Sequence, residues 1–399
     1  MTGGGSARGK AKAGAMKRDL IRSKLERVDQ ALDRAIAHAE IPGAVVLARM
    51  PREGEFVEYG AARGYAVLHP ERIPMTRGTI FDLASLTKPL ATTTALLLLA
   101  EDGAIGLDDP VARFLPGFAV HGKAQVTIRH LLTHSSGLAP WRAYYEEVAA
   151  KERQSSLRIA GTAAARAVVL DGILCAGLVH EPGARAAYGD LDFIVLGAVV
   201  EAVAGQPLDA FCQARIFAPL GLQQTRFVRL GDGAQALPQR VRRQCAATEN
   251  CPWRGRILWG EVHDPNASVM GGVAGHAGLF APADDVMRFA AVVLDVYHGR
   301  SDALPGDLLR TFLTRQNLPE SSEWALGWDT PTEGGSSGRY FSQNSVGHLG
   351  FTGTSLWIDL EREVVVVMLT NRVHPVVKEG RFELRSVVHN LVLEAFLAE

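Results

Sequence analysis

Apolar residues recur every three or four positions in the first part of the chain, as they do along one face of an amphipathic helix. The apolar positions are Leu20, Ile21, Leu25, Val28, Leu32 and Ile36. The tripeptide Ile41-Pro42-Gly43 follows, and a helix commonly ends where proline and glycine come together. The pattern therefore predicts one helix that stops at this tripeptide.

Strand-like runs lie at both ends of the chain. Residues 43–50 and 55–60 are alternating or apolar, and residues 354–359 and 364–370 read as a second pair of strands joined by a short charged turn. Residues 382–397 predict a last helix that would lie across the sheet.

The middle of the chain, from about residue 101 to 260, is expected to be helical and rich in loops. Two apolar stretches in it, residues 159–174 and 191–204, suggest a hairpin of helices. No internal repeat is visible. Strands from both chain ends therefore flank a helical insertion.

The composition is that of an ordinary globular enzyme. Hydrophobic residues make up 47% of the 399 residues, charged residues 21%, and the formal net charge is −1. We therefore expect no nucleic-acid partner and no attraction to an anionic membrane. No apolar run is long enough to span a bilayer, so we also expect no membrane span. Free buried thiols are predicted for Cys175, Cys212, Cys245 and Cys251, because their spacing matches no framework.

The N-terminal segment bears on the cellular compartment. Residues 1–15 consist mainly of glycine, alanine, lysine and serine and contain no apolar core of a secretory signal. A disordered leader or tag is therefore expected at residues 1–16. Taken at face value the protein would be cytoplasmic, whereas a truncated N-terminus would fit a periplasmic or secreted protein. The sequence does not indicate the oligomeric state.

The tetrad Ser85-Leu86-Thr87-Lys88 carries the first candidate chemistry. It starts an apolar run over residues 89–100 that reads as a buried helix. Residues three apart share a helix face, so the hydroxyl and the amine would meet. A helix start also presents N–H groups and a dipole that favour a developing oxyanion. Alone the tetrad is a weak signal, since about one Ser-x-x-Lys is expected by chance in such a chain.

Two further motifs follow in the order that this chemistry needs, Tyr188-Gly189-Asp190 and His348-Leu349-Gly350. With them the chain resembles the serine β-lactamase and penicillin-binding-protein superfamily, in the class C-like branch that also includes D-amino-acid peptidases and esterases. The elements of that superfamily are Ser-x-x-Lys, Tyr-x-Asn and Lys-Thr-Gly, the last often His-x-Gly. Residues 127–138 and 271–280 match as well, and the resemblance extends from about Ile41 to the C-terminus.

The resemblance implies an α+β fold of the β-lactamase/transpeptidase type. An antiparallel sheet would be formed by the N- and C-terminal segments, flanked by helices, with an inserted all-helical region. We expect one hydrolase domain over residues 17–399. Its α/β part would comprise about residues 17–100 and 265–399, and its helical insertion about residues 101–264.

The catalytic roles follow from the chemistry of serine and from the resemblance. A serine hydroxyl needs a neighbouring base, and both Lys88 and Tyr188 are candidates. The resemblance implies that these two act as a unit, and the division of the proton between them stays open. It also implies an oxyanion hole formed by the backbone N–H groups of Ser85 and Phe351, with Gly350 keeping the strand edge open for the substrate.

Asp190 and His348 depart from the pattern of the relatives. Asp190 replaces an asparagine; an ionised carboxylate cannot donate a hydrogen bond and would hold Lys88 protonated more firmly. Alternatively, Asp190 caps the helix that begins at Leu191. His348 replaces a lysine that helps to capture a substrate carboxylate, which a neutral imidazole does poorly, or it is simply a packed strand residue. Arg372 could supply a compensating cation or lie on the surface.

Two histidines outside the three motifs also have expected roles. His134 is expected to brace a loop, and His276 is expected at the rim of the cleft in contact with the substrate. One cluster suggests a metal site: Glu249, Cys251, His263, Asp264 and His276. Its spacings are irregular for structural zinc, so we expect no metal and no cofactor.

The leading hypothesis is a serine hydrolase that forms an acyl-enzyme at Ser85 and cleaves a small ester or amide, in the manner of an esterase. The alternative is a penicillin-recognising D-alanyl-D-alanine carboxypeptidase or a class C-type β-lactamase. The departures at Asp190 and His348 weigh against that alternative. A minor alternative is a non-catalytic binding protein on this fold. The expected partner is thus a small-molecule ester, amide or β-lactam.

Overall fold

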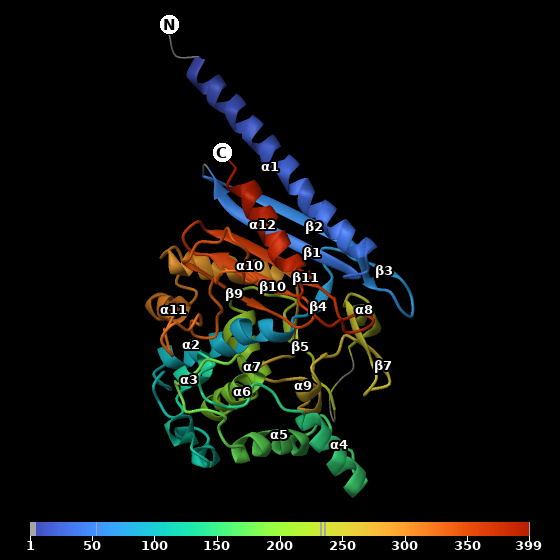
Figure 1. Cartoon of the computed structure of the whole chain (residues 1–399), viewed down its shortest axis with the longest axis vertical. Coiled ribbons are helices and arrows are strands. Elements are labelled where there is room, and N and C mark those ends of the chain that lie inside the picture. The colour runs from blue at the N-terminus through green and yellow to red at the C-terminus, as the bar shows by residue number, and fades with distance from the viewer. Residues whose placement is uncertain (1–4, 53, 232–233, 235–236, 399) are drawn as a thin grey trace.

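The structure is a computed structural model that describes the backbone of residues 5–52, 54–231, 234 and 237–398, and side chains from residue 20 onward. Figure 1 shows a sheet-containing part and a mostly helical part, with α1 (Gly5–Ala37) and α12 (Leu384–Phe396) beside the sheet. The leader was expected to be disordered over residues 1–16, whereas the backbone of residues 5–16 belongs to α1. That these residues are a leader or tag stays a prediction.

The amphipathic pattern near the start of the chain is confirmed in α1. Ile21, Leu25, Val28 and Leu32 are buried beneath the helix, whereas Leu20 is exposed. The face they form packs against α12 and against the outer face of the sheet.

A six-stranded antiparallel sheet joins the two ends of the chain in the order β3-β2-β1-β11-β10-β9. The strands are β1 (Gly43–Arg52), β2 (Glu55–Val67), β3 (Ile73–Pro74), β9 (Ser345–Leu349), β10 (Ser355–Asp359) and β11 (Val364–Thr370). At the centre β1 pairs with β11, with Val46 opposite Met368. The prediction that both chain ends build one antiparallel sheet is confirmed.

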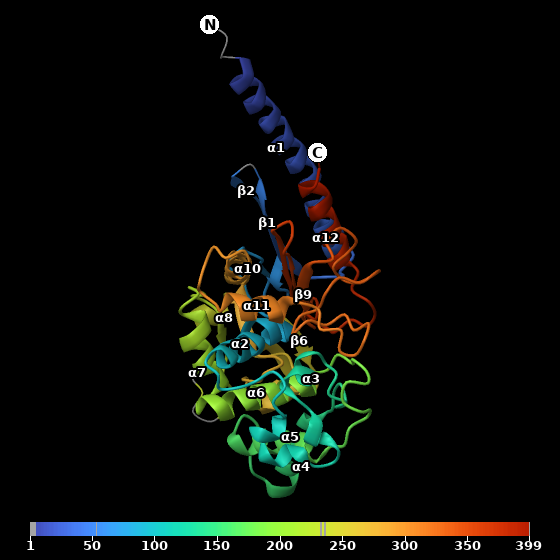
Figure 2. The ribbon, with the colours of Figure 1, turned by 90° about the vertical axis from the view of Figure 1, so that its left-hand side faces the viewer.

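The two faces of the sheet are buried against different layers. Along β1, Val45 and Leu47 face the core shared with the helical part, whereas Val46 and Ala48 face the core beneath α1 and α12. This period of two is what a strand covered on both sides requires. The helix α10 (Ala283–Tyr297) contacts β1 and β11 on the inner face, and Figure 2 shows α1 and α12 on the opposite side.

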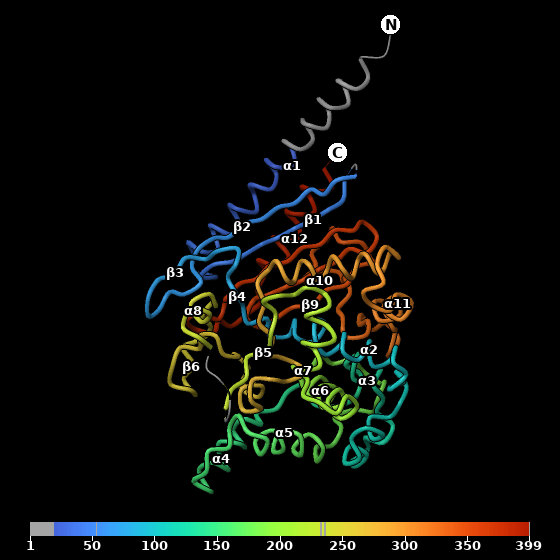
Figure 3. The backbone as a smooth tube through the Cα atoms, turned by 180° about the vertical axis from the view of Figure 1, so that it is seen from behind, coloured from blue at the N-terminus to red at the C-terminus, as the bar shows by residue number. Residues whose placement is uncertain are grey.

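The inserted region is mostly helical, and Figure 3 shows its helices gathered at the end of the molecule away from α1. The helices outside the sheet layers are α2 (Thr94–Glu101), α3 (Ile128–Leu132), α4 (Tyr144–Ser155), α5 (Ala163–Cys175), α6 (Asp190–Ala204), α7 (Leu208–Cys212), α8 (Gln239–Arg242), α9 (Pro265–Val269) and α11 (Gly306–Leu313). The predicted helical hairpin corresponds to α5 and α6, which contact each other.

This region was expected to be entirely helical, but it also contains short strands. The hairpin of β6 (Ala247–Cys251) and β7 (Arg256–Trp259) stands alone, and β5 (Arg226–Phe227) joins β8 (Leu279–Pro282) and β4 (Ile80–Asp82) in a small sheet. This small sheet matters for function, because β4 leads directly into the Ser-x-x-Lys motif.

The predictions on the cysteines and on membrane-spanning helices can be compared directly with the structure. All four cysteines are free, but Cys175 is exposed rather than buried. Within the described part of the chain, no single helix is long and apolar enough to cross a membrane. One bent pair, Asp190–Ala204 with Leu208–Phe217, meets the criteria of length and composition together.

Candidate active site

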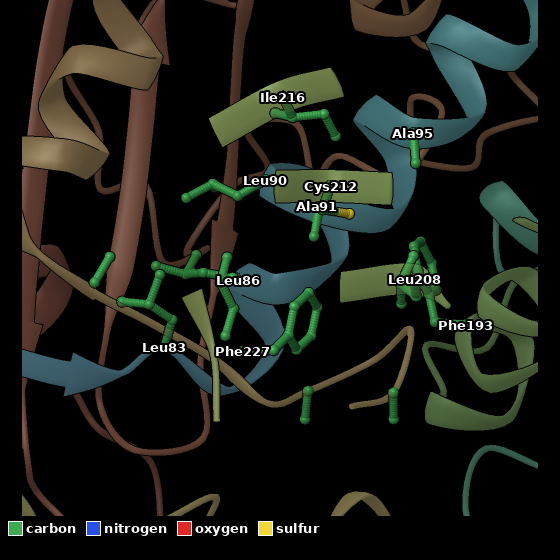
Figure 4. Packing of buried hydrophobic residues seen from close by; sticks show 14 of the residues in the cluster. Leu83, Leu86, Leu90, Ala91, Ala95, Phe193, Leu208, Cys212, Ile216 and Phe227 are labelled. Carbon is green, nitrogen blue, oxygen red and sulfur yellow. The ribbon is translucent and has the colours of Figure 1, made fainter. Parts of the chain in front are cut away.

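The segment that carries Ser85 is anchored in the larger core. Leu83, Leu86 and Leu90 are at most 1% exposed. Figure 4 shows them among side chains from α6, α7, β5 and the π-helical turn η6 (Gln213–Phe217). A nucleophile carried by such a packed segment is held in one position, as a catalytic group requires.

The backbone bends sharply just before Ser85. Ala84 has a φ of +48°, a left-handed conformation that is costly for a residue other than glycine. The Oδ1 of Asp82 accepts a hydrogen bond from Ala84 N at 2.9 Å and so holds the bend. The chain then continues through the 3-10 turn η1 (Ala84–Leu86) and the π-helical turn η2 (Lys88–Thr93) into α2.

The side chain of Lys88 is completely buried, and its amine meets the other motif residues. Its Nζ lies 3.0 Å from Ser85 Oγ, 2.9 Å from Tyr188 Oη and 2.6 Å from Asp190 Oδ1. These three acceptors match the three donors of an ammonium group. The backbone carbonyl of His276 lies 3.5 Å away. Two motifs separated by about a hundred residues thus converge on one amine.

The charges of this cluster fix its resting protonation. Burial alone favours the neutral amine, but the negative charge of Asp190 and the contact with Tyr188 outweigh it and raise the pKa of Lys88 above its ordinary value. Burial of the phenol raises the pKa of Tyr188, although Lys88 acts in the opposite direction. Near neutral pH the resting site therefore holds an ammonium at Lys88 and a neutral phenol at Tyr188.

Asp190 is the first residue of α6, but its carboxylate does not cap the helix. The N-cap position is Gly189, and no side chain accepts a capping hydrogen bond there. The backbone N–H of Asp190 donates to Pro140 O at 2.7 Å. The helix-cap alternative is wrong, because the carboxylate binds Lys88.

The turn after β9 carries Phe351, the second expected oxyanion donor. Thr352 Oγ1 and Thr354 Oγ1 donate to the backbone carbonyls of residues 82–83, at 2.8 and 3.0 Å. These bonds tie the turn to the segment just before Ser85. Across the described residues, neither the N–H of Ser85 nor that of Phe351 donates to a protein acceptor. Two free N–H groups held in place by the same pair of hydrogen bonds suit an oxyanion hole. Their role as oxyanion donors stays a prediction.

Gly350 is required for close packing, and its expected role in keeping the strand edge open for the substrate stays a prediction. A Cβ at this position would lie 2.5 Å from Leu83 O and 2.1 Å from Thr354 Oγ1, so only glycine fits. Arg385 on α12 donates to the carbonyls of Gly350 and Gly353 and holds the same turn. No sequence signal marks Arg385, because strands β10 and β11 separate it from the His348-Leu349-Gly350 motif along the chain.

His348 is 2% exposed and neutral. Burial, reinforced by the positive charge of Lys88, lowers the pKa of His348 well below its ordinary value. Its Nδ1 lies 2.8 Å from the backbone carbonyl of the next residue. The expected weakness as a carboxylate ligand therefore has a structural basis. The guanidinium of Arg372 donates to the backbone carbonyls of Lys378 and Gly380, and its role as a compensating cation stays a prediction.

His276 does not lie at the rim of the cleft, contrary to expectation. It is 1% exposed, and its Nε2 lies 2.9 Å from Asp264 Oδ1. The same oxygen accepts from Ala267 N at 2.7 Å and caps α9. Burial would raise the pKa of Asp264, but His276 and these bonds outweigh it and hold that pKa at about 2. The pair therefore braces the loop beneath the cleft.

Four of the five residues of the suggested metal cluster, all except Cys251, form two pairs. His263 Nε2 lies 3.2 Å from Glu249 Oε2, and His276 pairs with Asp264. One donor atom each of Asp190, Asp264 and His276 lie within 4.8 Å of one another, a spacing that a divalent cation could bridge. The ammonium of Lys88 already binds Asp190 in that space. The absence of a metal stays a prediction.

The ring of Tyr188 is held by other aromatic rings. Trp324, which the sequence did not reveal, stacks on it at 5.5 Å, and His134 meets it edge-on at 4.8 Å. The Nδ1 of His134 lies 3.1 Å from Asp192 Oδ2, which agrees with its expected role as a loop brace. Ser136 donates to the other oxygen of Asp192.

Replacing Asp192 by asparagine is expected to stabilise the protein at high pH. Burial raises the pKa of Asp192 to about 8. The folded protein thus keeps a proton that the unfolded chain loses near pH 4, so the free energy of unfolding falls as pH rises from about 4 to 8. Asparagine mimics the protonated acid without titrating. Denaturant unfolding at pH 5 and pH 8 should show the variant gaining about 1–3 kcal/mol on the wild type between these values. Parallel pH dependences would contradict the shifted pKa.

A serine and a tyrosine that both contact a buried lysine are the groups that nucleophilic acyl transfer needs. The model of the beta-lactamase family matches residues 28–389, and the chain belongs to this family. It is a hydrolase of the serine β-lactamase and penicillin-binding-protein type, as the motifs suggested. The family membership and the α+β fold expected from the resemblance are thereby confirmed.

Two relatives show how far the similarity reaches. An *Escherichia coli* K12 protein provisionally named a D-alanyl-D-alanine carboxypeptidase is 34% identical over 344 residues, which cover 79% of this chain and 75% of that protein. The N-acetylmuramyl-L-alanine amidase of *Bacillus subtilis* strain 168 is 32% identical over 379 residues, covering 88% and 81%.

Solved structures support the fold. EstCE1, a hydrolase with promiscuous acyltransferase activity, superimposes with a TM-score of 0.70 at 24% identity and covers 94% of this chain and 99% of its own. The octameric penicillin-binding protein homologue from *Pyrococcus abyssi* gives a TM-score of 0.68 at 21% identity, covering 93% and 76%. At these identities the likeness concerns the fold.

Proposed function

We propose that this protein is a serine amidase that forms an acyl-enzyme at Ser85 and releases an amine from a small cell-wall-type amide such as N-acetylmuramyl-L-alanine. The observation that carries the proposal is the convergence of Ser85, Tyr188 and Asp190 on the buried amine of Lys88. This geometry provides a nucleophile, a proton carrier and a charged partner within direct contact.

The first step forms the acyl-enzyme. Ser85 Oγ attacks the amide carbon, and its proton passes to the unit of Lys88 and Tyr188. That unit then protonates the leaving nitrogen as the C–N bond breaks. The N–H groups of Ser85 and Phe351 would stabilise the negative oxygen of the tetrahedral intermediate.

The second step releases the acid. A water molecule gives a proton to the same unit and attacks the ester carbon on Ser85. The O–C bond to the serine breaks, and Ser85 Oγ regains a proton from Lys88 and Tyr188. Because Asp190 raises the pKa of Lys88, the reactive form of the unit is scarce at low pH and becomes more populated as pH rises.

The leading hypothesis from the sequence allowed a small ester or an amide, and the names of the relatives favour the amide. The two relatives described above are more than 30% identical to this chain, and both carry names of amide-cleaving enzymes. A carboxypeptidase acting on D-alanyl-D-alanine remains the second candidate, favoured by the name of the *E. coli* relative. The neutral, buried His348 supplies no charge for a carboxylate, and because both candidate substrates carry one on the leaving amino acid, His348 does not distinguish them.

The test is intact mass after incubation with a fluorophosphonate and, separately, with a fluorescent penicillin. We expect a phosphonate adduct that Ser85→Ala abolishes, no stable penicillin adduct, and Ser85-dependent release of alanine from N-acetylmuramyl-L-alanine. A stable penicillin adduct would move the assignment to the carboxypeptidase. The absence of any Ser85-dependent adduct would contradict catalysis by this serine.

A further inference from the structure

A cavity of about 660 Å³ opens beside the catalytic cluster. Tyr188, Asp190 and Phe351 form the part of its wall that faces Ser85 and the expected oxyanion hole. Any group that occupies this cavity therefore lies next to the reacting bond. Its remaining walls come from the loop before α4, the β6–β7 hairpin and the segment before α9.

Aromatic rings form two walls of the cavity. Trp141, Tyr145 and Trp253 line one wall, with Trp141 47% and Trp253 42% exposed. Tyr145 meets Trp253 at 4.9 Å and 68°, so the two rings are not stacked on each other. On the other wall Phe351 is 58% exposed and stacks on His263 at 5.5 Å. Two tryptophans with this much open surface are unusual unless a ligand covers them.

The polar atoms of the cavity are mainly acceptors. Glu249 and Asp264 both line it. Asp264 uses one carboxylate oxygen for His276 and for the cap of α9. Within the described residues, its second oxygen has no hydrogen-bond donor from the protein. Carboxylate oxygens in such positions suit ligands that carry hydroxyl or amide N–H donors.

The cations in and beside the cavity are already engaged. Arg254 has a side chain only 5% exposed, and its guanidinium donates to the backbone carbonyls of Val262, His263 and Asp264 at 2.7, 2.9 and 3.2 Å. The ammonium of Lys88 is bound by Asp190. An anionic group would thus meet carboxylates and, among the described residues that line the cavity, no cation free of protein partners, which is unfavourable.

We infer that this cavity binds an uncharged pyranose ring on the acyl side of the scissile amide. The inference rests on the proposed function and deepens it. The apolar C–H face of a sugar ring lies well against Trp141 and Trp253, while its hydroxyl groups donate to Glu249 and Asp264. A flat aromatic platform with a few placed polar groups is the composition of a specific small-ligand site. In N-acetylmuramyl-L-alanine the sugar belongs to the acyl group, so the acyl-enzyme would keep it in the cavity while alanine leaves.

The first experiment compares two substrates that share the scissile amide. N-acetylmuramyl-L-alanine carries the sugar, and lactoyl-L-alanine lacks it. For the wild type we expect kcat/KM to be on the order of 100-fold higher with the sugar, because remote binding energy is used at the reacting bond. Equal kcat/KM values for the two substrates would overturn the inference.

The second experiment changes the aromatic wall. Trp141→Ala and Trp253→Ala should each lower the ratio of kcat/KM between the two substrates by about tenfold, mainly through KM of the sugar substrate. Trp141→Phe keeps a flat ring and should restore most of that ratio. Phe56→Ala is the matched control, because Phe56 is a 52% exposed aromatic residue on β2 outside the cavity. An unchanged ratio in both alanine variants would overturn the inference.

The third experiment measures binding without turnover. In Ser85→Ala, N-acetylmuramyl-L-alanine should quench tryptophan fluorescence saturably, and Trp141→Ala in this background should weaken the binding. Choline tests whether the same walls instead hold an alkylammonium, since aromatic rings also bind such cations. Quenching by choline but not by the sugar would overturn the inference. Failure of the proposed function would look different, because the Ser85-dependent phosphonate adduct would then be missing.

Discussion

Replacing Lys88 by methionine is expected to lower kcat/KM by about 10³–10⁴-fold, near the upper range for losing a general acid–base group. The amine is the atom through which Ser85, Tyr188 and Asp190 meet, at 3.0, 2.9 and 2.6 Å. Methionine has a similar length and fills the buried space but can neither accept nor donate the proton. The measurement is the rate with a chromogenic ester at pH 8, with Ser85→Ala as the background.

The same variant separates catalysis from folding. Without Lys88 the partly buried carboxylate of Asp190 loses its cation, so the melting temperature should fall as well. Adding Asp190→Asn removes that charge and should recover the melting temperature but not the activity. A single Lys88→Met variant that keeps more than about a tenth of the wild-type kcat/KM would show that Lys88 is not the proton carrier.

The motifs were visible in the sequence because each is local. Ser85 and Lys88 are one helical turn apart, and Tyr188 and Asp190 flank a single glycine at the start of an apolar helix. The hydrophobic pattern likewise predicted β1, β11 and the amphipathic part of α1. In these cases the spacing along the chain already determines which side chains share a face.

The supports of the site could not be predicted, because they depend on contacts between distant segments. Trp324 stacks on Tyr188 from a loop more than a hundred residues later. Arg385 reaches the turn after β9 from the last helix. His276 was placed at the rim because its glycine-rich surroundings resemble a loop, yet its ring is buried against Asp264. A local pattern shows that a loop exists but not which way its side chains point.

The role of Asp190 follows only when the sequence motif and the three-dimensional contacts are considered together. The sequence alone showed that a carboxylate stands where the relatives carry an amide. The structure adds that this carboxylate touches the buried amine rather than the helix terminus. The substitution therefore changes the charge of the proton-transfer unit while leaving the three-residue geometry in place. Its consequence should appear in the pH dependence rather than in the fold.

Replacing Asp190 by asparagine is expected to move the ascending limb of the pH profile of kcat/KM to lower pH by about one to three units. Asp190 is the charge that raises the pKa of Lys88, and burial acts in the opposite direction. When the charge is removed, burial dominates and the pKa of Lys88 falls. The neutral amine that accepts the proton of Ser85 is then populated at lower pH. The measurement is kcat/KM for a chromogenic ester from pH 5 to 10.

Asp307→Asn provides the control, because Asp307 is a fully exposed aspartate that pairs with Arg310 away from the site. It should leave the profile of kcat/KM where the wild type has it. Two outcomes for Asp190→Asn would contradict the assignment, and they differ in meaning. An unmoved limb with full activity would show that Asp190 does not set the pKa of Lys88. An activity lost at every pH would show that the carboxylate itself takes the proton, since an amide placed there cannot accept one.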